Sequence, residues 1–153
     1  MADRVLCWTA RLGLAASGAL LLSATGALAA ASGLTVSHPW MRYLTPQTPA
    51  AGYFTLSNDS DHAVTLSGAA SPDCGQLMLH QSVVQNGTAK MVMVHSVPVP
   101  SHGSVTFKPG AYHLMCVSPA AAIRPGQTVP VTLRFQNGSS LDAMFPVHGA
   151  TGK

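Results

Sequence analysis

Short runs of alternating hydrophobic and polar residues follow one another along the chain from residue 34 onward. They are rich in Val, Thr, Leu and aromatic residues, and Gly, Pro, Asn or Asp bounds each of them, which is typical of β-strands. The runs lie at residues 34–38, 53–58, 63–68, 76–84, 90–97, 103–108, 112–117, 128–135 and 140–147. Because no stretch shows a convincing helical period, the pattern predicts an all-β sandwich or barrel.

Asn86-Gly87 is a strong signal for a two-residue hairpin turn, because both turn positions favour a positive φ. Pairing outward from this turn predicts three facing pairs, namely Ser82–Met91, His80–Met93 and Met78–His95. Side chains alternate between the two faces of a strand. One face of the hairpin is therefore apolar and is expected in the core, with Leu77, Leu79, Val92 and Val94. The other face carries soft donors, namely Met78, His80, Met91, Met93 and His95.

A second group of such donors lies in the run 112–117, where His113 and Met115 share one face of the strand. In the hairpin, His80 and Met91 are diagonal neighbours, a separation that long side chains can span. Two His/Met pairs on separate elements can meet around one ion if the two elements are adjacent.

The chemistry of these side chains indicates copper. Zinc sites use Cys, His and carboxylate, whereas calcium and magnesium prefer oxygen ligands. Imidazole together with thioether selects copper, and several thioethers favour Cu(I). Two imidazoles and two thioethers carry no net charge, which suits a monovalent ion.

The first 30 residues resemble a secretory signal peptide. Arg4 and Arg11 precede an uncharged run rich in Leu, Ala and Gly, which ends at a small-x-small pattern, Ala27-Leu28-Ala29. Cleavage is favoured over a membrane anchor, which leaves one exported domain at residues 31–149 and a short tail at 150–153. We expect this chain to be a monomer without membrane insertion. Cys7 precedes the apolar run, so no lipid attachment is expected.

The remaining composition excludes several functional classes. From residue 31 onward six basic residues face four Asp and no Glu, which gives a net charge of +2, and the basic residues are scattered. No basic stripe indicates nucleic-acid binding. Without Glu, and without an arrangement of Ser, His and Asp or of paired carboxylates, no enzyme activity is expected.

The chain resembles the periplasmic copper chaperones of the PCu(A)C type. Their signature is a His, ten residues, a Met, twenty-one residues, a His, one residue and a Met, and His80, Met91, His113 and Met115 match every interval. The segments HPWMR, AAGYFTLSN and ASPDCGQLMLHQS also occur in the expected order. The resemblance implies a cupredoxin-like Greek-key β-sandwich with these four residues as Cu(I) ligands. It also implies delivery of copper toward cytochrome c oxidase subunit II, often together with a Sco-type protein.

Two questions about the ligands stay open in the sequence. The hairpin register places Met93 opposite His80, whereas the family spacing selects Met91, and a longer loop or a bulge would reconcile the two. Met93, Met78 and Cys116 are therefore secondary candidates. Cys74 and Cys116 can form a disulfide, remain free or bind metal, because the sequence does not give their separation.

Two other functions compete with the chaperone. A blue-copper electron-transfer protein needs one Cys and two His as equatorial ligands, with Cys usually before the second His. Here Cys116 follows both histidines, which disfavours this site. A metal-free secreted β-sandwich that acts as an interaction domain is the other alternative.

Overall fold

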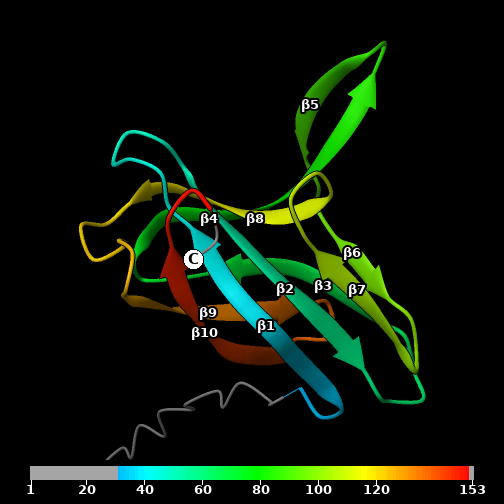
Figure 1. The fold of residues 1–153 in the computed structure, drawn as a ribbon. Coiled ribbons are helices and arrows are strands. Elements are labelled where there is room, and N and C mark those ends of the chain that lie inside the picture. The colour runs from blue at the N-terminus through cyan, green and yellow to red at the C-terminus, as the bar shows by residue number, and fades with distance from the viewer. Residues whose placement is uncertain (1–30, 152–153) are drawn as a thin grey trace, which may run out of the picture.

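The computed structural model describes residues 31–151, and all the regular secondary structure in this range is β. It has ten strands (Figure 1): β1 (Leu34–Arg42), β2 (Ala50–Asn58), β3 (Val64–Ala70), β4 (Cys74–Gln85), β5 (Thr88–Met93), β6 (Val97–Val99), β7 (Gly103–Phe107), β8 (Tyr112–Pro119), β9 (Thr128–Phe135) and β10 (Ser140–His148). Within the same range, no helix has the length and apolar character needed to cross a membrane. The predicted all-β, cupredoxin-like sandwich is confirmed. The predicted signal peptide lies outside the described residues.

The strands form two sheets that are joined along one edge. The first contains β5, β4, β8, β2 and β1 in that order, with β7 also paired to β2. The second contains β10, β9, β3 and β6, and a short parallel pairing of β1 with β10 at Met41 and Val147 connects the two. All other neighbours are antiparallel.

The core fills the space between the two sheets. Phe54 of β2 stacks on Phe107 of β7 with ring centroids 4.3 Å apart, and it contacts the edge of Phe145 from β10 at 5.7 Å. All three rings are buried. Aromatic contacts of this kind add to the free energy gained from burying their area, so they hold the sheets together.

The β4–β5 hairpin has the predicted register. Asn86 and Gly87 have φ values of 52° and 74°, as a two-residue turn requires. His80 pairs with Met93 and Ser82 with Met91, and no longer loop or bulge interrupts the ladder. The predicted pairing of Met78 with His95 is wrong, because β5 ends at Met93.

The run at residues 90–97, predicted as one strand, is divided between the two sheets. β5 pairs with β4 in the first sheet, whereas β6 pairs with β3 in the second. Residues 94–96 cross from one sheet to the other, so they cannot stay in either ladder.

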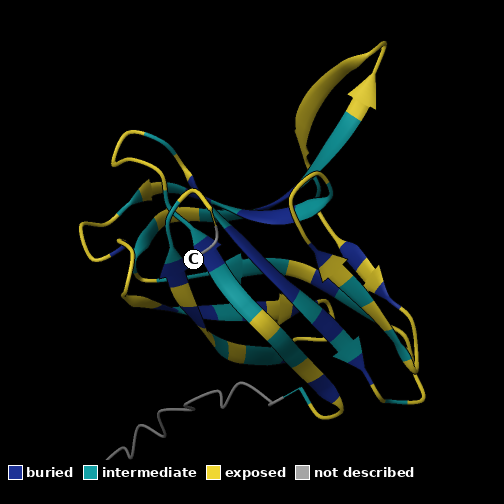
Figure 2. Cartoon of the chain, in the orientation of Figure 1, coloured by how far each residue is buried: buried dark blue, intermediate teal, exposed yellow. Residues whose placement is uncertain are grey.

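The far part of the β4–β5 hairpin extends away from the sandwich (Figure 1), and every residue of β5 is exposed (Figure 2). The expectation that Val92 lies in the core is therefore wrong, because no opposing sheet covers this part of the hairpin. Leu79 is buried, and Leu77 and Val94 pack against the core as expected.

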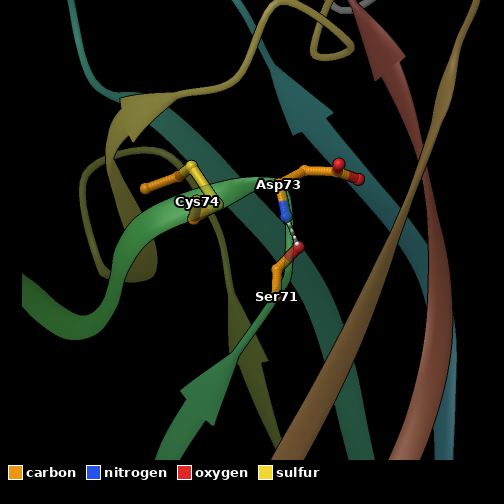
Figure 3. Close-up of a disulfide and its surroundings, with 4 residues drawn as sticks. Ser71, Asp73 and Cys74 are labelled. Carbon is orange, nitrogen blue, oxygen red and sulfur yellow. Dashed lines mark hydrogen bonds between the residues drawn. A yellow bond between two sulfur atoms is a disulfide. The ribbon is translucent and has the colours of Figure 1, made fainter.

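A disulfide between Cys74 and Cys116 joins β4 to β8, with Cα atoms 5.4 Å apart across 42 positions of sequence. Figure 3 shows this bridge beside the turn that leads into β4, where the Asp73 backbone N–H donates to Ser71 Oγ at 3.2 Å. The sulfur atoms of Cys74 and Cys116 are bonded to each other, so neither residue has a free thiol. The suggestion that Cys116 supplies a thiolate to a metal is therefore wrong for this form of the protein.

Candidate metal centre

His80 and His113 lie side by side on adjacent strands. They are directly paired in the β4–β8 ladder, and their ring centroids are 5.8 Å apart. Both are buried, with exposures of 9% and 5%. Antiparallel pairing thus brings together two imidazoles that are 33 positions apart in sequence. Strands β4 and β8 are therefore adjacent, as a metal site shared between them requires.

The next pair on the same face of these strands is Met78 with Met115. Since residues two apart on a strand share a face, the two histidines and two methionines form one surface of soft donors. Met91 and Met93 of β5 continue this surface across the hairpin ladder, opposite Ser82 and His80.

A cavity of about 320 Å³ opens beside His113, and Met91 and Met115 both line it. Three of the four residues selected by the family spacing therefore border one cavity, and the fourth, His80, packs beside His113. Met91 reaches the cavity without any change in the predicted register. The right-handed twist of a two-stranded ribbon is large, which allows a residue at a diagonal position to reach a site.

The turn before β8 orients the ring of His113. Its Nδ1 lies 3.2 Å from the carbonyl oxygen of Ala111. A carbonyl only accepts hydrogen bonds, so Nδ1 donates and the lone pair stays on Nε2, as in metal-binding histidines. Gly110, with φ of 80°, permits this turn, in which the Ala111 N–H donates to the carbonyl of Lys108 at 3.0 Å.

His80 has both ring nitrogens buried and without a hydrogen-bond partner among the described residues. Leaving a buried polar atom unsatisfied costs free energy, so such a group calls for an explanation. Burial lowers the pKa of His80, and the nearby His113 lowers it further. The neutral form that this favours is the form that binds metal. A metal ion at this face would give one nitrogen the partner it lacks.

Arg42 and Tyr53 also line the cavity, and reasoning from the sequence alone did not identify them. The Arg42 guanidinium carbon lies 5.7 Å from the centre of the Tyr53 ring. Burial raises the pKa of Tyr53, while Arg42 acts in the opposite direction. No acidic residue is among the described residues lining this cavity, and residues 31–151 contain no cluster of three His, Cys, Asp or Glu side chains suited to a metal. A metal ion in this cavity would therefore need thioethers among its ligands.

The secondary candidates do not line this cavity, although Met78 pairs directly with Met115 in the β4–β8 ladder. Met78 and Met93 line a different cavity, together with His95, and Cys116 is in the disulfide. The structure therefore groups Met91, and not Met93, with His113 and Met115.

Comparison with known proteins gives consistent results. The family described as "Putative lipoprotein LpqE-like" matches residues 34–147. A relative named "Putative lipoprotein Lxx21020", from Leifsonia xyli subsp. xyli, is 30% identical over 123 residues, which cover 80% of this chain and 74% of the relative. The absence of a lipid on this chain remains a prediction, since Cys7 lies outside the described residues.

Solved structures with the same fold include the copper-bound PCuAC domain of PmoF2, with a TM-score of 0.65 and 23% identity, covering 79% of this chain and 97% of that domain. DR1885 from Deinococcus radiodurans has been solved in two forms. Its apo form has a TM-score of 0.61 and 28% identity over 100% of both chains. Its Cu(I) form has a TM-score of 0.54 and 29% identity over 82% of each.

Proposed function

From the membership of this chain in the LpqE-like family, which is the PCu(A)C family, we propose that it is a periplasmic copper chaperone. It binds Cu(I) through His80, Met91, His113 and Met115. It delivers the ion toward the copper centre of cytochrome c oxidase subunit II, with a Sco-type protein as a second partner.

The observation that supports this proposal best is the buried pair of facing imidazoles beside a cavity that Met91 and Met115 help to line. Neither ring nitrogen of His80 has a hydrogen-bond partner within residues 31–151, and the hydrogen bond to Ala111 leaves Nε2 of His113 free to bind metal. Met91 and Met115 provide soft sulfur atoms. All four donors are neutral, so they match a soft monovalent ion better than a hard divalent one.

The surroundings of the site agree with Cu(I) as cargo. Arg42 places a positive charge in the cavity wall, and no carboxylate there offsets it, so an additional charge on the ion is disfavoured. The related DR1885 has been solved with Cu(I), which supports copper as the ion here too.

Release is as important as binding in a chaperone. Met91 is 67% exposed on the projecting hairpin, so an acceptor protein can approach the ion from this side and replace one ligand at a time. A blue-copper electron carrier is a poorer match, because its site needs a cysteine thiolate. Both cysteines of residues 31–151 are in the disulfide.

The direct test is an anaerobic titration with a chromogenic Cu(I) competitor, followed by mixing of the loaded protein with the apo soluble domain of cytochrome c oxidase subunit II. We expect the wild-type chain and Met144→Leu, a control at an exposed methionine of β10, to bind one ion tightly and transfer it. We expect His80→Ala with His113→Ala to abolish tight binding. Equal binding by this double variant contradicts the proposed site, and tight binding without transfer contradicts the proposed delivery.

A further inference from the structure

A second group of soft donors lies next to His80. Met78, Met93 and His95 all line a cavity of about 200 Å³, and none of them lines the cavity beside His113. The chain thus brings two thioethers and one imidazole to the wall of one small space. These residues have no part in the ligand set proposed above.

The crossover between the sheets creates this space. The last contact of this segment with β4 is a hydrogen bond of 2.9 Å from the Val94 N–H to the carbonyl of Leu79. The chain then leaves the edge of β4 and continues to β6 in the second sheet. The cavity lies at this edge, with Ser67–Ala69 of β3 on its other side. His95 is in the crossover itself, between β5 and β6, where it is exposed and lines the cavity.

His80 connects this group to the first cavity. Met93 is its direct partner in the β4–β5 ladder, and Met78 lies two residues before it on the same face of β4. The His80 ring is nine-tenths buried, and neither of its nitrogens has a partner among the described residues. An unsatisfied imidazole therefore lies between Met93 of β5 and His113 of β8, while Met78 pairs directly with Met115 in the β4–β8 ladder.

We propose that Met78, Met93 and His95 form a second site for a soft monovalent metal ion such as Cu(I) or Ag(I). The three donors are neutral, and two are thioethers, which excludes a preference for zinc, calcium or magnesium. The site is weaker than the first, because Met93 is 53% exposed and His95 is also exposed, so both lose conformational freedom when they close on an ion. It gives an ion a place to stay directly beside the first site, because Met78 pairs with Met115 and Met93 pairs with His80.

This site does not depend on the function proposed above, and Ag(I) is a suitable probe for it. Ag(I) needs no reductant, so the Cys74–Cys116 disulfide stays intact during the titration. Methionine methyl groups labelled with ¹³C report each sulfur separately by NMR. In the wild-type protein, we expect the methyl signals of Met91 and Met115 to shift with the first equivalent. We expect the methyl signals of Met78 and Met93 to shift with the second equivalent of Ag(I).

Two double variants separate the sites. With Met78→Leu and Met93→Leu, which nearly conserve side-chain volume, we expect the second equivalent to be lost and the first to be kept. With His113→Ala and Met115→Leu, we expect the chain to keep one equivalent, detected at Met78 and Met93. Met144→Leu is the matched control at an exposed methionine and retains both equivalents.

Three results would overturn the second site. One is a shift of the Met78 and Met93 methyl signals in parallel with Met115 during the first equivalent, which means a single site. Another is the absence of any shift at Met78 and Met93. The third is complete loss of binding in the His113→Ala, Met115→Leu variant. If instead Met78 and Met93 respond while Met91 and Met115 do not, the second site stands and the proposed Cu(I) chaperone site fails.

Discussion

The two halves of the candidate centre come from regions with opposite properties. His80 and His113 lie in the sandwich, buried and paired across β4 and β8, and the disulfide joins the same two strands. Met91 lies on the projecting hairpin, where every residue of β5 is exposed (Figure 2). The imidazoles are packed in place by the sandwich, whereas the Met91 thioether is exposed to solvent.

This difference suggests how one site can both hold and release an ion. Preorganised ligands lose little conformational freedom on binding, so they provide affinity. A flexible, exposed methionine contributes less to affinity but is accessible to a competing ligand from an acceptor. The buried strands and the hairpin should therefore respond differently to mutation, and four predictions test this contrast.

The largest effect is expected from removing the disulfide that joins the two buried strands. For a loop of 42 residues, closure of the unfolded chain contributes about 4 kcal/mol to the free energy of unfolding. We expect the apo Cys74→Ala, Cys116→Ala variant to lose roughly this amount in urea denaturation. Met91→Ala on the hairpin should change the free energy of unfolding by less than about 0.5 kcal/mol. Similar losses in both variants would remove the contrast between the two regions.

The next effect concerns copper affinity. Replacing a residue that hydrogen-bonds to a metal ligand typically lowers metal affinity by about 10–100-fold, so loss of a buried ligand itself should lower it further. We expect His113→Ala to weaken Cu(I) binding by roughly 100-fold or more, measured with a chromogenic competitor. His62→Ala, at an exposed histidine, is the matched control and should bind as the wild type does. An unchanged affinity in His113→Ala would show that the buried pair is not part of the site.

On the hairpin, Met91→Ala and Met93→Ala should differ from each other. Met91 shares a cavity with His113 and Met115, whereas Met93 lines the other cavity. We expect Met91→Ala to weaken binding of the first Cu(I) by about tenfold, or ~1.4 kcal/mol, and Met93→Ala to have little effect. The reverse order, in the same competition assay, would mean that the residue directly opposite His80 is the ligand.

The smallest effect is on the pH dependence of stability. Burial and His113 lower the pKa of His80 below its ordinary value of 6.5, which the unfolded chain retains. Between these two pKa values the unfolded chain binds more protons, so the free energy of unfolding decreases as the pH falls below about 6.5. Above about pH 6.5 His80 is neutral in both the folded and the unfolded chain, so the free energy of unfolding no longer changes with the titration of this group. Urea midpoints of the apo protein between about pH 5 and 7.5 should show this decrease, and His80→Gln should reduce it while His62→Gln does not. An identical pH dependence of stability in the wild type and in His80→Gln would contradict the lowered pKa of His80.

Local patterns were sufficient to predict the hairpin and its register. Asn86-Gly87 determines the turn, and the pairing of His80 with Met93 follows by counting from it. The soft-donor face was also predictable, because alternation along a strand is a local property. The adjacency of β4 and β8 is not local. It was implied by the family spacing of His80 and His113, and no local pattern specifies it.

The incorrect expectations share one cause, which is that they depended on tertiary context. Val92 was expected in the core because it alternates with exposed residues, yet the hairpin extends beyond the opposing sheet. The split between β5 and β6 reflects a crossover between sheets that strand propensity does not encode. The disulfide, which the sequence left open, depends in the same way on the distance between Cys74 and Cys116, and only the paired strands determine that distance.

X-ray absorption at the copper edge of the Cu(I)-loaded protein, prepared under anaerobic conditions at one ion per chain, tests the ligand set most directly. We predict nitrogen neighbours from His80 and His113 and sulfur neighbours from Met91 and Met115, with sulfur scattering reduced in Met91→Ala. A spectrum with sulfur but no nitrogen neighbours, or with nitrogen and no sulfur, would contradict a site made by joining the buried imidazoles to the thioethers.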